Sequence, residues 1–155
     1  MTSKLILRLF SPEDAEECSF LMQDHFLNHA DNLPLETRQN IAQARDKNYI
    51  QQIARDRTIV VAIEKNKIVG MGALKENEIR HMFVLANFQH KGIGSAILLF
   101  LENEAKKKEL DSIFVYSVSY AEKFYAKYGF KVIKKDMIER QGSFLEAILM
   151  KKEFF

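Results

Sequence analysis

A pair of glycines lies where an apolar, strand-like segment passes into an amphipathic helix. The joint reads FQHKGIGSA over residues 88–96, between a strand predicted over 79–85 and a helix predicted from about Ser95. Gly92 and Gly94 have no Cβ, so the backbone can approach a ligand closely and can take a positive φ. The first amides of a helix have no intrahelical acceptor, and the helix dipole there favours negative charge. This joint therefore predicts a cradle for phosphate groups.

Two common phosphate-binding loops are excluded by their own requirements. A P-loop needs Gly, four residues and then Gly-Lys-Ser/Thr, a string that the sequence lacks. A dinucleotide fingerprint needs a small residue three positions after Gly94, where this chain has Ile97, and an acid that closes the second strand. Asp111 instead precedes the next predicted strand. The remaining pattern is Gln-x-x-Gly-x-Gly leading into a helix.

A second motif, AEKFYAKYGF, follows over residues 121–130. Together the two motifs resemble those of the GCN5-related N-acetyltransferase (GNAT) family. The first resembles the pyrophosphate loop, and the second resembles the Ala-x-x-(Phe/Leu)-Tyr-x-x-x-Gly-Phe string on the helix beside the pantetheine arm. The resemblance extends over the whole chain, with specific motifs in about residues 67–135. It implies acetyl-CoA as a co-substrate.

The hydrophobic pattern predicts an α+β chain. The predicted elements, in order, are a strand near 5–9, helices over 11–29, 35–44 and 49–54, strands over 58–63, 68–74 and 78–85, a helix over 95–108, a strand over 112–118, a helix over 121–128, and a hairpin over 130–138 and 143–150. This order is similar to the acetyltransferase (GNAT) fold. That fold is a mixed, mostly antiparallel sheet of about seven strands flanked by helices, splayed between the fourth and fifth strands. We expect a single N-acetyltransferase domain over 1–155.

Composition limits the classes of protein that fit. A chain of 155 residues with 47% hydrophobic and 28% charged residues is typical of a globular domain. A net charge of +2 does not favour nucleic acid as a partner, and no apolar run is long enough to span a membrane. Met1 to Leu5 lack the apolar core of a signal peptide, and the single cysteine excludes an internal disulfide. We therefore expect a cytoplasmic protein.

The resemblance implies which residues bind the coenzyme. Main-chain groups of a strand would pair with the pantetheine, main-chain amides of the loop would hold the pyrophosphate, and the tyrosine helix would lie alongside. The expected coenzyme-binding residues are Phe83, Val84, Gln89, His90, Lys91, Gly92, Ile93, Gly94, Ser95, Ser117, Ala121 and Phe124. Many relatives have asparagine at the end of the fifth strand. Here Ser117 or Ser119 would have to replace that contact.

Tyr125 is the first candidate for a catalytic residue. The family works by direct attack without an acyl-enzyme, and the tyrosine at this place in the motif is assigned as the general acid for the coenzyme sulfur. A phenol with a reference pKa of about 10 can donate to a developing thiolate. The alternative is a tyrosine that only packs beside Phe124. Cys18 lies within a predicted helix without an implied histidine partner, so it is expected in the core or semi-buried.

Glu78 is the second catalytic candidate. It opens the strand that leads into the coenzyme loop, which resembles the position of the glutamate base in the histone-acetylating branch of the family. A carboxylate there could accept the ammonium proton directly or through water. The alternative is an exposed turn glutamate beside Asn77. His81, on the same strand, or a water chain are the other candidates for the base.

The first helices and their loop build the acceptor side in the family. Specificity is therefore expected within residues 29–49, with Asp31, Glu36 and Tyr49 as candidate amine contacts. The stripe Phe20, Leu21, Phe26 and Leu27 is expected in the core or in the cleft wall. His25 and His29 have the i,i+4 spacing of metal ligands, but no third ligand is evident, so no metal is expected.

The leading hypothesis is an enzyme that transfers an acetyl group from acetyl-CoA to a primary amine of a small molecule, a peptide or a protein. The alternative is a non-catalytic acyl-CoA-binding sensor or interaction module. A toxin that acetylates charged tRNA would need a pronounced basic patch. The resemblance leaves the oligomeric state open, with a homodimer as one possibility, since dimers are common in the family.

Overall fold

The computed structural model describes residues 4–155; residues 1–3, part of the segment considered for a signal peptide, lie outside the described residues. The strands are β1 (Ile6–Leu9), β2 (Thr58–Glu64), β3 (Lys67–Lys75), β4 (Glu78–Val84), β5 (Ser112–Ser117), β6 (Lys131–Arg140) and β7 (Ser143–Glu153). The helices are α1 (Ala15–Asn28), α2 (Leu35–Ala44), α3 (Lys47–Ile53), α4 (Ile93–Lys107) and α5 (Glu122–Lys127), with short 3-10 turns η1 (Pro12–Asp14), η2 (Ala86–Phe88) and η3 (Ser119–Ala121).

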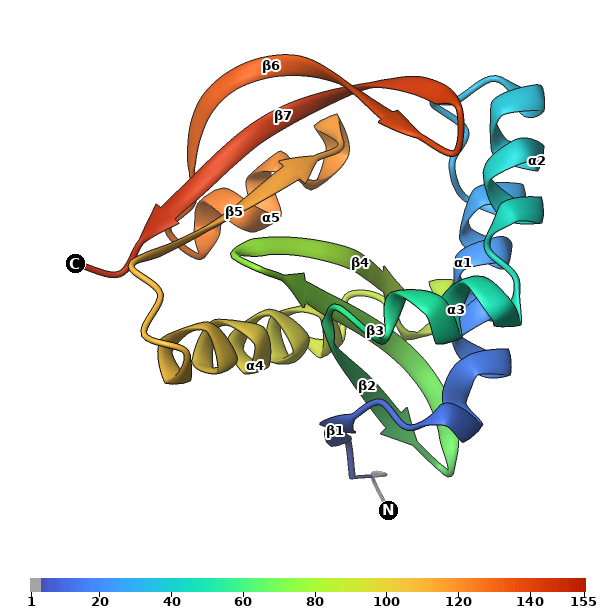
Figure 1. Cartoon of the computed structure of the whole chain (residues 1–155), viewed down its shortest axis with the longest axis horizontal. Coiled ribbons are helices and arrows are strands. Elements are labelled where there is room, and N and C mark those ends of the chain that lie inside the picture. Colours follow the sequence, from blue (N-terminus) through green and yellow to red (C-terminus); the bar gives the residue numbers. More distant parts are fainter. Residues whose placement is uncertain (1–3) are drawn as a thin grey trace.

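The strands form one mixed sheet in the order β1-β2-β3-β4-β5-β7-β6 (Figure 1). All neighbouring strands pair antiparallel except β4 and β5, which run parallel. A parallel pair needs a crossover connection, and α4 provides it. The expected α+β fold with seven strands and flanking helices is confirmed.

The parallel strands are joined over a short length only. Glu78 pairs with Phe114 and Ile79 pairs with Val115, and no further pair joins β4 to β5 within residues 4–155. Beyond these pairs the two ribbons separate (Figure 1). The predicted splay between the fourth and fifth strands is therefore confirmed. It leaves main-chain groups of both strands without a sheet partner.

A β-bulge lies in the middle of β4. Residues 71–73 of β3 lie opposite residues 80–83 of β4, so β4 contains one extra residue. His81 takes a φ of +56°, in the left-handed region that a non-glycine residue rarely occupies. Gly72 lies opposite the bulge. A bulge increases the local twist of a strand and re-aims its side chains, which helps β4 turn away from β5.

Helices cover both faces of the sheet. α4 buries Ile97, Leu98, Leu101 and Ala105 against one face, the four residues that the sequence places on one side of this helix. α1 and α3 pack on the other face, and Cys18 is fully buried there, as expected. Each large apolar side chain removed from water in this way contributes about 1.5–3 kcal/mol. The packed helices thus hold β4 on both sides.

The apolar stripe expected on the first long helix is only half buried. Phe20 and Leu27 are 57% and 43% exposed, whereas Leu21 and Phe26 are buried, so the predicted stripe is wrong for two of its four residues. Residues 20 and 27 lie seven positions apart on α1 and share the side of the helix that faces away from the sheet. No helix within residues 4–155 has the length and apolar composition needed to cross a membrane.

Candidate active site

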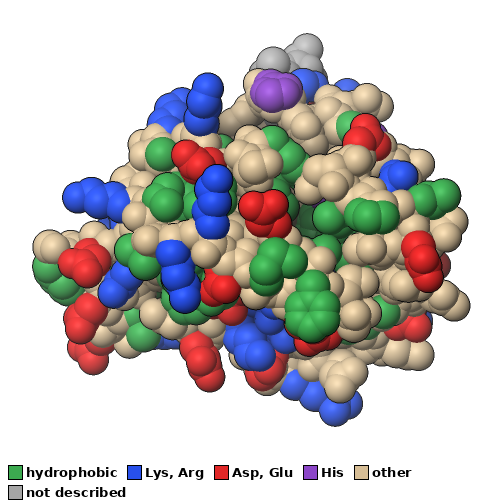
Figure 2. Space-filling model, turned by 90° about the horizontal axis from the view of Figure 1, so that it is seen from above, with side chains coloured by type: hydrophobic (Ala, Val, Ile, Leu, Met, Phe, Trp, Pro, Cys, Tyr) green, Lys and Arg blue, Asp and Glu red, His purple; other side chains and the backbone are tan. Residues whose placement is uncertain are grey.

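A cleft of about 710 Å³ opens where β4 and β5 separate. One half is lined by the 88–95 loop, the start of α4 and α5; the other half is lined by β4, α1, the end of α2 and the β6–β7 hairpin. The face shown in Figure 2 is hollowed near its centre, and apolar side chains line the hollow. On that face the Lys and Arg side chains are interspersed with Asp and Glu. The cleft thus joins the predicted coenzyme side to the predicted acceptor side.

The glycine loop has the geometry of an anion cradle. Gly92 is the N-cap of α4 with a φ of +83°, so the helix begins two residues before the predicted Ser95. The first intrahelical bond runs from the amide of Ala96 to the carbonyl of Gly92, so the amides of residues 93–95 have no helical acceptor. Nothing lies within 4 Å of the position that a Cβ of Gly92 would occupy. The loop therefore offers main-chain donors and open space to an anion.

Eleven of the twelve predicted coenzyme-binding residues line the cleft. Lys91 is the exception, since it is exposed and its ammonium lies 5.2 Å from the centre of the Phe88 ring. Gln89 Nε2 donates to the carbonyl oxygen of Val84 (3.1 Å), which ties the loop to the end of β4.

Ser117 does not present a free hydroxyl to the cleft. It is buried, and its Oγ donates to the carbonyl oxygen of Val118 (2.7 Å). Ser119 is exposed and does not line the cleft. Tyr116 and Tyr120, which no sequence motif singles out, line this part of the cleft instead.

Tyr125 is buried within α5 and lines the cleft. Its ring packs edge-on against Phe124 and Phe130. Burial raises the pKa of the Tyr125 phenol above its ordinary value, so the phenol keeps its proton at neutral pH. The neighbouring Tyr128 shares a hydrogen bond between its hydroxyl and Ser95 Oγ, which links α5 to the start of α4.

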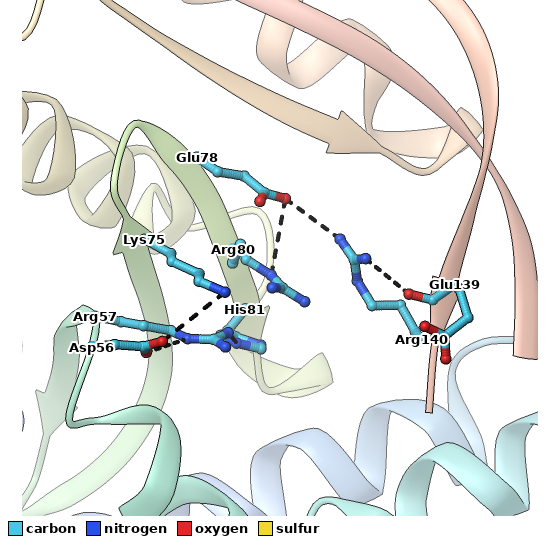
Figure 3. Close-up of polar contacts among 8 residues, drawn as sticks. All are labelled: Asp56, Arg57, Lys75, Glu78, Arg80, His81, Glu139 and Arg140. Carbon is cyan, nitrogen blue, oxygen red and sulfur yellow. Dashed lines mark hydrogen bonds and ion pairs between the residues drawn. The ribbon is translucent and has the colours of Figure 1, made fainter. Parts of the chain in front are cut away.

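Glu78 is partly buried at the start of β4 and lines the other half of the cleft. Two arginines hold its carboxylate (Figure 3). Arg140 Nη2 donates to Glu78 Oε2 at 3.4 Å, and Arg80 Nε lies 3.9 Å from the same oxygen. Arg140 stands at the end of β6, so this contact bridges the two strands across the cleft. Glu78 is therefore an ion-paired cleft residue and not an exposed turn glutamate.

His81 is buried at the bulge. Arg57 Nη1 donates to His81 Nε2 (2.6 Å), and Arg57 Nε donates to Asp56 (3.0 Å) (Figure 3). Burial and the surrounding arginines lower the pKa of His81 well below its ordinary value. The imidazole is therefore neutral at physiological pH, and its Nε2 lone pair is already engaged.

Arg45 lies at the end of α2, lines the cleft and is only 4% exposed. Its Nε donates to Gln141 Oε1 (3.2 Å), its Nη1 lies 3.9 Å from Met22 Sδ, and its guanidinium lies 4.9 Å from the centre of the Phe26 ring. Within residues 4–155, no carboxylate forms an ion pair with it. Burial lowers the pKa of Arg45 to about 10, so the group remains charged at neutral pH.

The predicted acceptor contacts are not brought together. Asp31 and Glu36 are exposed and do not line the cleft, and Asp31 lies 3.9 Å from Arg38. Tyr49 is half-buried and packs edge-on to His81 behind the cleft wall. Three arginines from distant parts of the chain, Arg45, Arg80 and Arg140, line this half of the cleft instead.

The two histidines of the 25–29 pair have different contacts and do not form a shared site. His25 lies in the cleft against Phe26 and Phe83, and His29 Nε2 lies 3.4 Å from Asp24. In the part of the chain that the structure describes, no group of three metal-ligating side chains is found.

The sequence matches the family described as the Acetyltransferase (GNAT) domain over residues 26–154. The chain belongs to this GNAT acetyltransferase family. The match includes both motifs, the whole splayed region and nearly all of the cleft lining. A comparison with curated protein sequences gives no significant match.

Solved GNAT structures share the fold at low sequence identity. A GCN5-related N-acetyltransferase of Rhodopseudomonas palustris superposes with a TM-score of 0.88 at 20% identity, covering 99% of this chain and 98% of that chain. PaiA N-acetyltransferase of Thermoplasma acidophilum, solved with coenzyme A, gives 0.81 at 24% identity, covering 97% and 99%. YncA of Salmonella typhimurium, solved with its cofactor acetyl-CoA, gives 0.70 at 17% identity, covering 99% and 95%.

Proposed function

We propose that this GNAT acetyltransferase transfers an acetyl group from acetyl-CoA to a primary amine by direct attack in a ternary complex. The observation that carries the proposal is a single cleft that joins an anion cradle, a splayed pair of strands and a buried phenol. Holding both reactants in one cleft can itself lower the barrier by about 7–11 kcal/mol.

The described residues fit acetyl-CoA. The free amides at the start of α4 would hold the pyrophosphate, with Gly92 and Gly94 leaving room for its close approach. Phe83 and Val84 lie beyond the residues of β4 that pair with β5, so main-chain groups on this edge of the strand would pair with the pantetheine as an added strand. The structures of PaiA with coenzyme A and YncA with acetyl-CoA support this choice of co-substrate.

The reaction balances with few protein groups. The amine nitrogen forms a bond to the acetyl carbon while the bond from that carbon to sulfur breaks; the amine loses a proton and the sulfur gains one. Main-chain amides of the β4 bulge would stabilise the charge that develops on the carbonyl oxygen. Tyr125 would supply the proton to sulfur, because its buried phenol is protonated at neutral pH.

Glu78 is our choice for the base that accepts the amine proton, directly or through water. Its carboxylate lies in the cleft, on the strand that leads to the coenzyme loop. His81 is less suited to this role, because its Nε2 already accepts from Arg57 and its pKa is lowered. Cys18 is buried away from the cleft, which agrees with a reaction that forms no acyl-enzyme.

The experiment that tests this function is a screen of primary amines with acetyl-CoA, read by release of free thiol. We expect thiol release that depends on an amine and an N-acetylated product with the mass of one added acetyl group. Calorimetry with acetyl-CoA alone separates the alternatives. Tight binding without turnover of any amine would contradict the enzyme and favour an acyl-CoA-binding module.

A further inference from the structure

The acceptor half of the cleft contains more arginines than carboxylates that pair with them. Arg45, Arg80 and Arg140 all line it. Within residues 4–155, Arg80 and Arg140 form ion pairs with one carboxylate only, that of Glu78, and Arg45 forms none. Glu146 also lines the cleft, but it is exposed and forms no ion pair with these arginines in the described chain. We define the arginine cluster as these three arginines.

Arg45 is the member whose charge is least compensated. Its contacts are an amide oxygen, a thioether sulfur and aromatic rings, none of which carries a negative charge. Burying a charged group away from water is unfavourable, and an opposite charge with hydrogen bonds is needed to offset that cost. A buried arginine that lines a cleft without a carboxylate therefore has donors available to an anionic ligand. Its Nη2 makes no hydrogen bond to any residue of the described chain.

The other two arginines converge on the same region. Gln141, which accepts from Arg45, is the chain neighbour of Arg140. Arg80 and Arg140 share a single Glu78 oxygen at 3.9 Å and 3.4 Å, and Arg140 Nη1 also donates to the carbonyl oxygen of Glu139 (3.0 Å); their other side-chain donors make no hydrogen bond within the described chain (Figure 3). Burial and, to a smaller extent, the positive charge of Arg140 lower the pKa of Arg80, in line with the contact that both arginines make with Glu78.

We propose that the amine acceptor also carries an anionic group, a carboxylate or a phosphate, which the arginine cluster binds. This assignment rests on the proposed acetyl transfer, because it concerns the acceptor of that reaction. Planar guanidinium groups match both anions with paired hydrogen bonds. Acceptors with several positive charges, such as polyamines, would be repelled from this half of the cleft.

The cluster would also assist the chemistry. Nearby positive charge disfavours an ammonium group relative to the neutral amine. An acceptor anchored through its anion would therefore present an amine that loses its proton more readily. Glu78 lies between Arg80 and Arg140, so the proposed base would be near an acceptor that the cluster binds.

The test compares acceptors that differ only in the anion. The pairs are α- and ω-amino acids with their carboxamides, and amino sugar phosphates with the free amino sugars; polyamines form a third group. We expect the anionic member of at least one pair to be acetylated with a kcat/KM at least about 10-fold higher, and which pair responds distinguishes carboxylate from phosphate. Equal or faster turnover of neutral amines or polyamines would overturn the assignment.

Variants connect the preference to the cluster. Arg140→Gln should lower the preference for the anion, measured as the kcat/KM of the anionic acceptor divided by that of its neutral partner, by about 10-fold or more. Arg55→Gln is the matched control, since Arg55 is exposed and does not line the cleft. An equal change for both acceptors would mean that Arg140 acts only on the structure, and would also overturn the assignment.

A binding measurement tests whether the arginine cluster binds an anion, independently of any turnover. Inorganic phosphate and acetate are titrated into the wild-type protein and Arg140→Gln at low ionic strength, and binding is followed by calorimetry. We expect at least one anion to bind the wild type and to bind Arg140→Gln more weakly. Absence of binding, or equal binding to both proteins, would overturn the anion site. Absence of turnover with every amine would contradict only the proposed enzyme.

Discussion

Tyr125 and His25 both line the cleft, and burial shifts the pKa of each so that its neutral form is favoured. Burial is the cause in both cases, but its effect on the function of the two side chains differs. The phenol retains the proton that a departing thiolate needs, whereas the imidazole gives up its charge in the folded state. Each of the following two variants isolates one of these effects.

Tyr125→Phe removes the phenol oxygen and keeps the packing against Phe124 and Phe130. We expect kcat for amine acetylation to fall on the order of 10²-fold, because proton transfer by a positioned side chain contributes on that scale. Calorimetric affinity for acetyl-CoA should remain close to that of the wild type. An unchanged kcat would remove Tyr125 from the reaction.

His25→Gln should weaken the loss of stability in acid. The pKa of His25 is lowered to about 4 in the folded state by burial, whereas an unfolded histidine titrates near 6.5. The unfolded chain therefore binds more protons between these values, so the stability from neutral His25 is complete above about pH 6.5 and is lost toward pH 4. From pH 7 to pH 5 the wild type should lose roughly 2 kcal/mol more of its free energy of unfolding than His25→Gln.

Urea unfolding at the two pH values measures this difference. The same pH dependence in His25→Gln and the wild type would contradict the shifted pKa.

Two elements define the cleft: the start of α4 and the bulged strand β4. The sequence predicts both, since the glycine loop, the strand before it and the apolar side of α4 follow from spacing and periodicity. The position of the bulge at His81 does not follow from periodicity, because a bulge changes the register of a strand without changing its composition. Each element is tested through the glycine next to it.

Gly94→Val should weaken acetyl-CoA binding by at least about 10-fold without unfolding the protein. A Cβ at Gly94 would lie 3.6 Å from Phe124 and 4.0 Å from Val84, an ordinary contact, but the branches of valine would extend into the cradle. Gly94→Ala is therefore the matched control and should bind nearly as well as the wild type. Calorimetry gives the affinities, and circular dichroism checks the fold. Full affinity in Gly94→Val would contradict the cradle.

Gly72→Ala should lower the free energy of unfolding by about 1–3 kcal/mol. A Cβ there would lie 2.5 Å from Ile97 Cγ2 and 2.7 Å from Met82 Sδ, so either α4 or the bulged strand would have to move. Chemical denaturation measures the change, with Gly94→Ala as the comparison at a site with room. Equal stability of the two variants would show that the packing beneath the bulge is looser than the distances indicate.

For the molecule as a whole, sequence patterns predict the order of elements well and the acceptor side poorly. The splay and the flanking helices follow from motifs that lie close together in the chain. The arginine cluster draws on residues 45, 80 and 140, which share no motif and meet only because β6 folds back across the cleft. One feature of the sequence could have indicated part of the cluster: side chains alternate along a strand, so Arg80 is expected on the same side of β4 as Glu78.

The strand order has a consequence for how the molecule is assembled. β1 to β4 pair only among themselves and β5 to β7 do likewise, apart from the two residue pairs at the parallel junction. The chain crosses from one group to the other once, through α4 and the turn near Glu109. The strand pairing thus divides the sheet into two groups, β1–β4 and β5–β7, joined only by the short parallel contact between β4 and β5. Opening the backbone at that turn would leave every antiparallel ladder whole within one fragment or the other.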